Sequence, residues 1–311
     1  MLVVFGTIYM NLNMTVKRFP AQGETALSPS YTMLPAGKGA NQALSAVRAG
    51  ASKAALVGHV GDDGPGLRIL QNLKRNGVMT SGVAKSVDFP TGISTTVNDK
   101  NGARQTYLAL GANSLVEADQ APSDIFRPGN VLLTQLELPL EQTARVMKSA
   151  HDKGAKVVLQ ASPMLPVPLP VLFLSDYLII NQARLLTFAK NLGIVGDDIV
   201  KVMRSLSEKA KLTCVAYHSD GSALLVSSEG HGFRFSSKTP QKAVDQFGAE
   251  DCFCGTFTSC IHEGQSEVQA HHMAATAYAL VCQQSSDEDD RFPYLEGIKD
   301  EMKTYGMIDP L

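Results

Sequence analysis

The chain has 311 residues, of which 44% are hydrophobic and 19% are charged, so it can bury a substantial core. Its net charge of −2 argues against a protein that binds nucleic acid or an anionic membrane surface. No apolar run approaches the roughly 20 residues needed to span a bilayer, and the first residues lack the pattern of a signal peptide.

Cysteine usage indicates the compartment. The chain has five cysteines, an odd and scattered set that does not suit a disulfide framework. These residues are Cys214, Cys252, Cys254, Cys260 and Cys282. A reducing environment fits this pattern, and we therefore expect a cytoplasmic, globular protein.

Short apolar runs of strand character alternate along the chain with segments of helical period. The expected strands are 2–5, 54–57, 131–134, 157–159, 177–180 and 212–216. The expected helices cover about 40–50, 69–77, 140–151, 197–210 and 252–262. Such alternation is typical of crossover units, so it predicts an α/β fold with a mostly parallel central sheet and helices on both faces.

Three extended segments interrupt this alternation. Segments 93–97 and 105–108 flank Asn101-Gly102, which is a strong hairpin signal, and 28–34 also has strand character. Because these segments lie between helices of the parallel sheet, we expect them to form a small separate sheet beside it. A second hairpin, 223–227 with 232–235, is expected to extend the edge of the main sheet.

Parallel sheets bind ligands at the carboxyl ends of their strands, which directs attention to three loops. In the first, Gly37 and Gly39 open a helix and would allow backbone N–H groups to approach a ligand, with Lys38 and Asn41 as further donors. A plain tight turn is an equal interpretation, and the Walker A pattern is absent. In the second loop, 58–66, an acidic pair would repel pyrophosphate, so Asp62 or Asp63 is predicted to cap a helix.

The third loop, 245–251, combines a Gly248-Ala249 step with a carboxylate at the start of a helix. The step would point backbone N–H groups toward a phosphate oxygen, and Asp251 could accept a proton from an attacking hydroxyl. Taken alone, the same pattern is better explained by an aspartate that only caps the helix. Neither Cys252 and Cys254 nor the histidines have the spacing of a metal site.

The order of the motifs is more informative than any one of them. Along the chain come 6–11, 37–43, 61–63, 90–92, 111–113, 135–137 and 245–251. This succession closely resembles the ribokinase branch of the PfkB-type carbohydrate kinases over nearly the whole chain. The string Gly-Lys-Gly-Ala-Asn-Gln-Ala at 37–43 is especially typical of ribokinase-like members.

The resemblance implies a single ribokinase-like domain over 1–311, with a β-sheet lid formed by about 9–36 and 88–113. It implies an enzyme that transfers the γ-phosphate of ATP to a hydroxyl of ribose or a similar sugar. Members use Mg²⁺ with ATP, many also bind a monovalent cation such as K⁺, and some form homodimers through the lid. Its partners would then be a small-molecule sugar and ATP.

The resemblance also assigns roles by position. Asp251 would be the general base, and Gly248 and Ala249 would form the anion hole. The sugar pocket would be lined by Asn11, Gly37, Lys38, Asn41 and Glu137. ATP would lie along Asn181, His218, Asp220, Gly221 and Glu250. A monovalent cation would sit beside Asp245.

Several positions depart from the family pattern. Glu250 stands where the anion hole usually has glycine, and Arg184 stands where an acid usually helps to organise Mg²⁺. Either Glu250 takes over the metal-organising role, or the two side chains pair and block the phosphate site. Asn11 replaces an aspartate, and Tyr9 replaces an asparagine and would narrow the sugar pocket.

These departures leave two alternatives to a sugar kinase. The first is a protein of this fold that binds a sugar or nucleotide but has impaired catalysis, as Glu250 and Arg184 suggest. The second is a nucleoside kinase, in which the ring of Tyr9 would stack on a base.

Overall fold

The computed structural model describes residues 1–236, 245–284, 290–303 and 306–311. Its main feature is a ten-stranded sheet in the order β14-β13-β12-β11-β10-β9-β8-β1-β4-β5. Pairing is parallel from β11 through to β5 and antiparallel from β11 to β14. The strands are β1 Leu2–Phe5, β4 Ala54–Gly61, β5 Met79–Ser86, β8 Val131–Thr134, β9 Lys156–Gln160, β10 Tyr177–Asn181, β11 Thr213–Tyr217, β12 Ala223–Val226, β13 Gly232–Ser236 and β14 Met307–Pro310.

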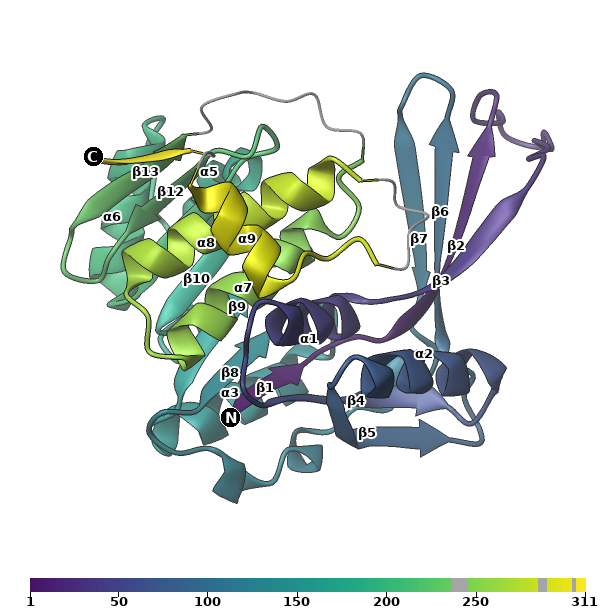
Figure 1. The fold of residues 1–311 in the computed structure, drawn as a ribbon, viewed down its shortest axis with the longest axis horizontal. Coiled ribbons are helices and arrows are strands. Elements are labelled where there is room, and N and C mark those ends of the chain that lie inside the picture. Colours follow the sequence, from purple (N-terminus) through teal and green to yellow (C-terminus); the bar gives the residue numbers. More distant parts are fainter. Residues whose placement is uncertain (237–244, 285–289, 304–305) are drawn as a thin grey trace.

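Helices cover both faces of this sheet (Figure 1). Because alternate side chains of a strand point to opposite faces, Val4 joins one core while Val3 and Phe5 join the other. The first core is closed by α1 Lys38–Arg48, α2 Gly64–Arg75, α7 Ala249–His262, α8 Glu267–Cys282 and α9 Leu295–Met302. The second is closed by α3 Leu140–Asp152, α4 Leu169–Leu172, α5 Gln182–Asn191 and α6 Ile199–Ala210. The predicted α/β class, with a mostly parallel sheet between helices, is confirmed.

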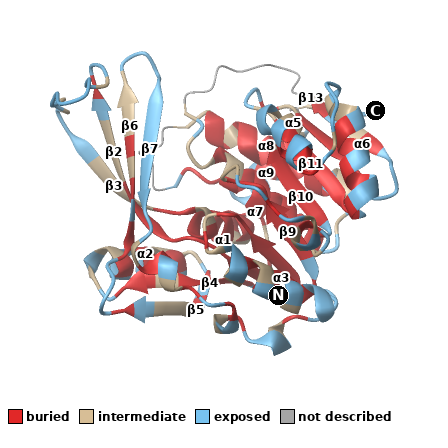
Figure 2. Ribbon diagram, turned by 180° about the vertical axis from the view of Figure 1, so that it is seen from behind, coloured by how far each residue is buried: buried red, intermediate tan, exposed pale blue. Residues whose placement is uncertain are grey.

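The four remaining strands form a separate small sheet that projects from the body (Figures 1 and 2). They are β2 Tyr9–Val16, β3 Tyr31–Ala36, β6 Gly92–Asp99 and β7 Arg104–Ala109, in the order β3-β2-β6-β7. The hairpin between β6 and β7 is confirmed, with Gly102 at φ 86° in its turn. The lid sheet therefore exists as predicted, while the limits of 9–36 and 88–113 within one domain stay a prediction.

Element boundaries differ from prediction at several places, and strand β5 and helices α5, α8 and α9 were not predicted. Strand β4 continues to Gly61, so half of the loop expected at 58–66 is strand. Asp63 then caps α2 by accepting a hydrogen bond from the Gly66 N–H at 2.8 Å, as predicted. Helix α7 begins at Ala249 with Gly248 as its N-cap, so the interpretation of Asp251 as a simple cap is wrong. The edge strand β14 was not predicted.

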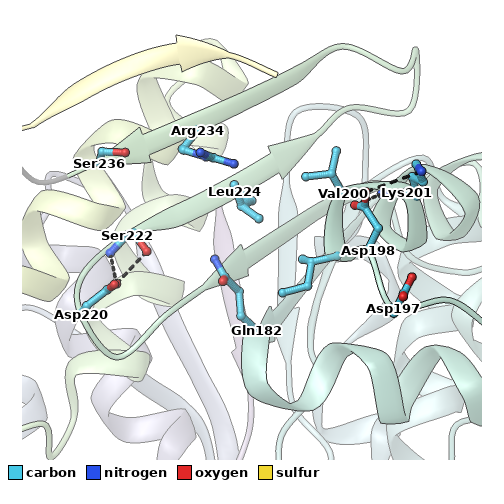
Figure 3. Close-up of a pocket in the computed structure, with 11 residues that line it drawn as sticks. Gln182, Asp197, Asp198, Val200, Lys201, Asp220, Ser222, Leu224, Arg234 and Ser236 are labelled. Atoms are coloured by element: carbon cyan, nitrogen blue, oxygen red, sulfur yellow. Dashed lines mark hydrogen bonds and ion pairs between the residues drawn. The ribbon is translucent and has the colours of Figure 1, made fainter.

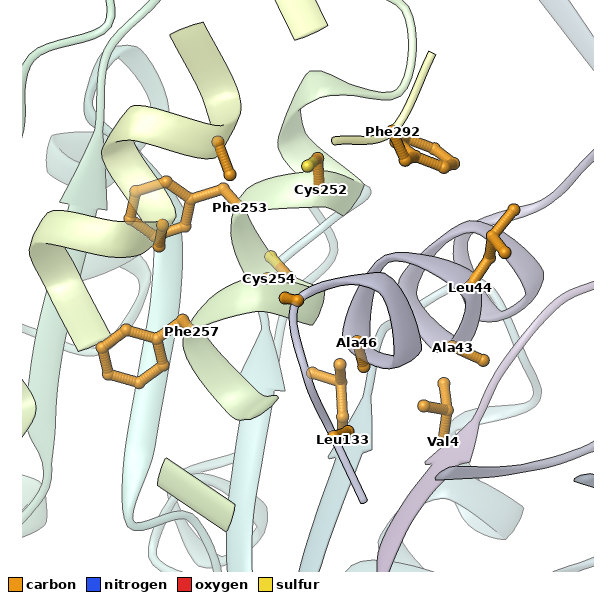
Figure 4. Packing of buried hydrophobic residues seen from close by; sticks show 14 of the residues in the cluster. Val4, Ala43, Leu44, Ala46, Leu133, Cys252, Phe253, Cys254, Phe257 and Phe292 are labelled. Atoms are coloured by element: carbon orange, nitrogen blue, oxygen red, sulfur yellow. The ribbon is translucent and has the colours of Figure 1, made fainter. Parts of the chain in front are cut away.

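The position of α7 depends on a close crossing with α1, which Figure 4 places above the central strands. A Cβ atom at Gly255 would lie 2.5 Å from the Gln42 carbonyl oxygen and 2.8 Å from Ser45 Cβ. Only glycine allows the two helix backbones to approach this closely. The crossing brings the first turn of α7, which carries Asp251, against the first turn of α1.

We expect Gly255→Ala to lower the free energy of unfolding by about 1–3 kcal/mol, because the new methyl group overlaps the α1 backbone. Gly297→Ala on α9 is the matched control, since no atom lies within 4 Å of its built Cβ, and it should leave stability unchanged or slightly raised. Urea unfolding of both variants tests this. Equal stability of the two would contradict the tight crossing.

Two expectations from composition concern the cysteines and the apolar segments. The five cysteines are free and buried, as predicted for a chain without a disulfide framework. Within the described ranges, none of the helices combines the length and apolar character that crossing a bilayer requires.

Candidate active site

A cavity of about 400 Å³ lies between the lid sheet and the first turns of α1 and α7. It is lined by Tyr9, Ala36, Gly37, Lys38, Asn41, Ser94, Arg104, Thr106, Leu108, Glu137, Ser162, Pro163, Arg184, Gln246, Phe247, Gly248, Glu250 and Asp251. Most of the sugar-pocket and catalytic residues predicted from the sequence therefore meet here, although they come from three distant parts of the chain.

Two glycines at the start of α1 set the floor of this cavity. Gly37 is the N-cap with φ 108°, and a Cβ there would lie 2.5 Å from the Thr7 carbonyl oxygen. A Cβ at Gly39 would lie 2.5 Å from the Gly6 carbonyl carbon. Glycine is therefore required at both positions because the backbone that follows β1 packs directly against them. The sequence had suggested a different requirement, the close approach of a ligand. The tight turn presents Lys38 and Asn41 to the cavity.

Asp251 is buried, and its carboxylate is held from two sides by α1. Asn41 Nδ2 donates to Oδ2 at 2.8 Å, and Gln42 Nε2 donates to Oδ1 at 3.1 Å. Burial raises the pKa of Asp251, while the Lys38 charge and these two hydrogen bonds oppose the rise. The carboxylate is therefore oriented, desolvated and basic, which are the properties of a general base.

Lys38 interacts with two carboxylates, those of the buried Asp251 and the partly buried Glu137. Its Nζ is 4.0 Å from Asp251 Oδ1, and Thr7 Oγ1 donates to Glu137 Oε2 at 2.5 Å. Burial disfavours the ammonium charge, but Asp251 and Glu137 outweigh it and raise the pKa of Lys38. Burial also raises the pKa of Glu137, against the influence of Lys38. The cavity floor thus holds one fixed cation and two acids.

The N-terminus of α7 faces the same cavity. Gly248 has φ 80°, and no side chain of the described residues caps the helix, so its first-turn N–H groups have no side-chain acceptor there. The Ala249 N–H itself donates to the Gln246 carbonyl at 3.2 Å. An uncapped helix N-terminus carries a partial positive charge and suits an anion such as a phosphoryl group.

Glu250 is held by residues of the neighbouring strands. Asn181, the N-cap of α5, donates from Nδ2 to Glu250 Oε1 at 3.5 Å. Burial first, and then Glu250, raises the pKa of Tyr217 well above its ordinary value. In the described part of the chain, Glu250 and Arg184 form no ion pair, so the predicted blocking pair is wrong for this structure.

The predicted ATP turn lies beside this site. His218 Nδ1 is 2.9 Å from Asp220 Oδ1, and Gly221 adopts φ 85°. Gln246 Nε2 donates to the Ser219 carbonyl at 2.9 Å, which joins the turn to the segment before α7. Asp220 also lines a second cavity, of about 890 Å³, that opens toward the start of α6 (Figure 3).

Two predicted residues lie differently from expectation. Asn11 is buried on β2, where its Oδ1 accepts a hydrogen bond from Thr96 Oγ1 at 3.1 Å, and it is not among the residues that line the cavity. Asp245 is paired with Arg104 of the lid at 2.7 Å. Among the described residues, no group of three or more His, Cys, Asp and Glu side chains is placed to hold a metal ion.

Comparison with known proteins supplies the family. The sequence profile described as "pfkB family carbohydrate kinase" matches residues 1–292. The chain belongs to this family. It is 30% identical over 291 residues to a ribokinase of Bacillus subtilis, covering 90% of this chain and 92% of the relative. It is 29% identical over 292 residues to a ribokinase of Schizosaccharomyces pombe, covering 91% and 92%.

Similar solved structures agree with this family assignment. A ribokinase from Thermotoga maritima superposes with a TM-score of 0.88 at 23% identity, covering 97% of this chain and 99% of that one. An Arabidopsis thaliana ribokinase, complexed with ribose and ATP, gives 0.84 at 25% identity, covering 97% and 98%. The predicted resemblance to ribokinase-like PfkB kinases is confirmed.

A chain of buried glutamines behind the site was not predicted. Gln135 Nε2 donates to Gln42 Oε1 at 2.6 Å, and Gln42 Nε2 donates to Gln160 Oε1 at 2.7 Å. These two hydrogen bonds fix the side-chain amide of Gln42, which contacts Asp251. Gln42 and Gln135 stand inside the quoted motifs, so a closer look at the non-glycine positions of those motifs could have found them. The third member, Gln160, ends a strand with no motif of its own.

Proposed function

We propose that this chain transfers the γ-phosphate of ATP to a hydroxyl group of ribose or a similar sugar. The observation that carries the proposal is the buried Asp251 carboxylate, oriented by Asn41 and Gln42 beside the uncapped N-terminus of α7. Family membership supports the carbohydrate kinase reaction. The two ribokinase relatives, and the ribokinase that binds ribose and ATP, support the choice of substrates.

Within this proposal, each group has a role. The acceptor hydroxyl gives its proton to Asp251 as its oxygen forms a bond to the γ-phosphorus, and the bond from that phosphorus to the ADP oxygen breaks. The N–H groups of α7 and the Lys38 ammonium stabilise the charge on the transferred phosphoryl group. Glu137, partly buried beside Lys38, accepts hydrogen bonds from the sugar. Phosphoryl transfer requires mainly such positioning and charge stabilisation.

The cavity residues suit a divalent cation that arrives with the nucleotide. Mg²⁺ takes oxygen ligands and commonly uses one or two carboxylates together with substrate phosphates. Glu250, at the nucleotide end of the cavity, would hold it, with Asn181 as its neighbour. When bound, Mg²⁺ would neutralise charge on the phosphates. A monovalent cation near Asp245 remains part of the proposal, although Arg104 already brings positive charge to that carboxylate.

An assay of ADP release over a panel of sugars and nucleosides, with Mg²⁺ and with or without K⁺, tests the proposal. We expect turnover with ribose or a close relative, and none in Asp251→Ala. Stabilisation by ribose or ATP without turnover would instead identify a binding protein with impaired catalysis. Preference for adenosine would identify a nucleoside kinase, but Tyr9 is only 2% exposed and offers little ring surface for stacking.

We also propose a homodimer through the lid in a cytoplasmic enzyme without nucleic-acid or membrane partners. Strand β7 is an exposed edge of the lid sheet, and Tyr31, Ile93, Tyr107 and Leu108 leave apolar surface on that sheet. Light scattering coupled to size-exclusion chromatography should give twice the chain mass of 33.3 kDa. A monomer at high protein concentration would exclude this assembly.

A further inference from the structure

An ion pair joins the lid to the body of the protein at the mouth of the cavity. Arg104 begins β7, and its Nη2 lies 2.7 Å from Oδ1 of Asp245, which is 141 residues away along the chain. Asp245 stands three residues before Gly248, the N-cap of α7. The pair therefore connects an edge strand of the small sheet to the segment that presents the phosphoryl site.

Both ends of this contact are fixed by further interactions. On the lid, Arg104 Nε donates to Asn98 Oδ1 at 3.1 Å, which holds the guanidinium against β6. On the body, the Phe247 N–H donates to the same Asp245 Oδ1 at 2.8 Å. The Arg104 guanidinium lies 5.9 Å from the Phe247 ring centroid, and Arg291 lies 4.7 Å from it. The segment 245–248 is thus held between a lid arginine and a body arginine.

The position of the pair also favours a specific role. The side chains of Arg104 and Asp245 are 34% and 18% exposed, so solvent screens their attraction less than that of the surface pairs. Arg104 lines the same cavity as Asp251 and Gly248. Arg104 belongs to the lid sheet and Asp245 to the segment before α7. The contact between them would therefore have to break if the lid moved away from the body.

We propose that Arg104 is a positioning residue for the transfer reaction, acting through Asp245. With the lid closed over the sugar, the pair holds segment 245–248 and so sets the N-terminus of α7 toward the phosphoryl group. This inference rests on the proposed function and extends it. It implies coupling between the two substrates, since any ligand that favours closure also favours the prepared phosphoryl site, and the effect is reciprocal.

The variant Arg104→Met tests this role, with Arg18→Met as the matched control. Arg18 is also a lid-side arginine in an ion pair, but its partner Glu24 lies on the same loop and does not reach the body. For Arg104→Met we expect kcat/KM for the sugar to fall about 10- to 100-fold, with the loss in kcat rather than in KM. Arg18→Met should match the parent protein. Arg104→Lys, which keeps the charge, should recover part of the loss.

A double-mutant cycle with Asp245→Asn separates the pair from its surroundings. If the two side chains act together, Arg104→Met combined with Asp245→Asn should be little worse than Asp245→Asn alone. Losses that multiply, or a loss confined to KM in Arg104→Met, would overturn the proposal.

Hydrogen exchange gives a readout that does not need turnover. In Arg104→Met, amides of 104–109 and of 245–248 should exchange faster together, in the presence of ribose, than in the parent protein. Unchanged exchange in both segments would overturn the positioning role even in an active enzyme. If the parent protein shows no sugar-dependent ADP release, the proposed function is refuted instead. The hydrogen-exchange comparison would still show whether Arg104 holds segment 245–248 in place.

Discussion

Replacing Asp251 by asparagine is expected to lower sugar-dependent ADP release by about 10²- to 10⁴-fold, the range that a general base contributes. The asparagine side chain has nearly the same shape, but its amide cannot accept the proton of the acceptor hydroxyl. Substrate binding should change much less, because Lys38 and Glu137 remain in place. Steady-state kinetics should therefore show the loss in kcat with a small change in KM.

The matched control is Asp62→Asn. Asp62 is an exposed aspartate that pairs with Lys85 at 2.9 Å on the outer side of the lid junction, away from the cavity. This variant should keep the parent rate. A circular dichroism melt should find Asp251→Asn folded, since it removes a buried charge. Near-normal turnover in folded Asp251→Asn would assign the proton to another acceptor and refute the mechanism.

Segments with a clear apolar pattern were predictable because the pattern of buried side chains can be read from the sequence of the segment itself. Strand β8 follows the expected 131–134 run residue by residue, since every side chain in it is buried. Strand β14, by contrast, is a four-residue edge that exists because it pairs with β13. A short run near the end of a chain has too little apolar pattern to predict such pairing.

Within the site, the residues predicted from the sequence are those that lie in the motifs shared with the PfkB-type kinases. The resemblance assigned roles to Lys38, Asn41 and Asp251, whereas the local pattern around each of them was equally or better explained by a turn or a helix cap. Their mutual distances could not be predicted, because these depend on the glycine at 255 that allows α1 and α7 to cross closely.

The interaction partners of the charged side chains were the least predictable feature of the site. The sequence left two alternatives for Glu250, a metal-organising role or a pair with Arg184, because the two charges seemed exchanged within one site. In the structure, Glu250 instead accepts a hydrogen bond from Asn181, and Asp245 forms an ion pair with Arg104. Such choices depend on the path of a lid strand and of a helix N-terminus in space, which residue types alone do not determine.

The second large effect is expected from Lys38→Met, which removes the one cation between Asp251 and Glu137. At pH 7 we expect kcat/KM for the sugar to fall about 10²- to 10³-fold, the usual cost of losing one group that stabilises developing charge. Lys85→Met, a surface lysine paired with Asp62, is the control and should match the parent protein.

The pH profile distinguishes this role from simple packing. Asp251 acts as a base only when ionised, so activity is lost as the pH falls through its pKa, which burial has already raised above the ordinary value. The Lys38 ammonium opposes that rise, and its removal must raise the pKa of Asp251 further. The acid limb of kcat/KM should therefore move to higher pH in Lys38→Met. A lower rate with an unmoved acid limb would mean that Lys38 contacts substrate without setting the ionisation of Asp251.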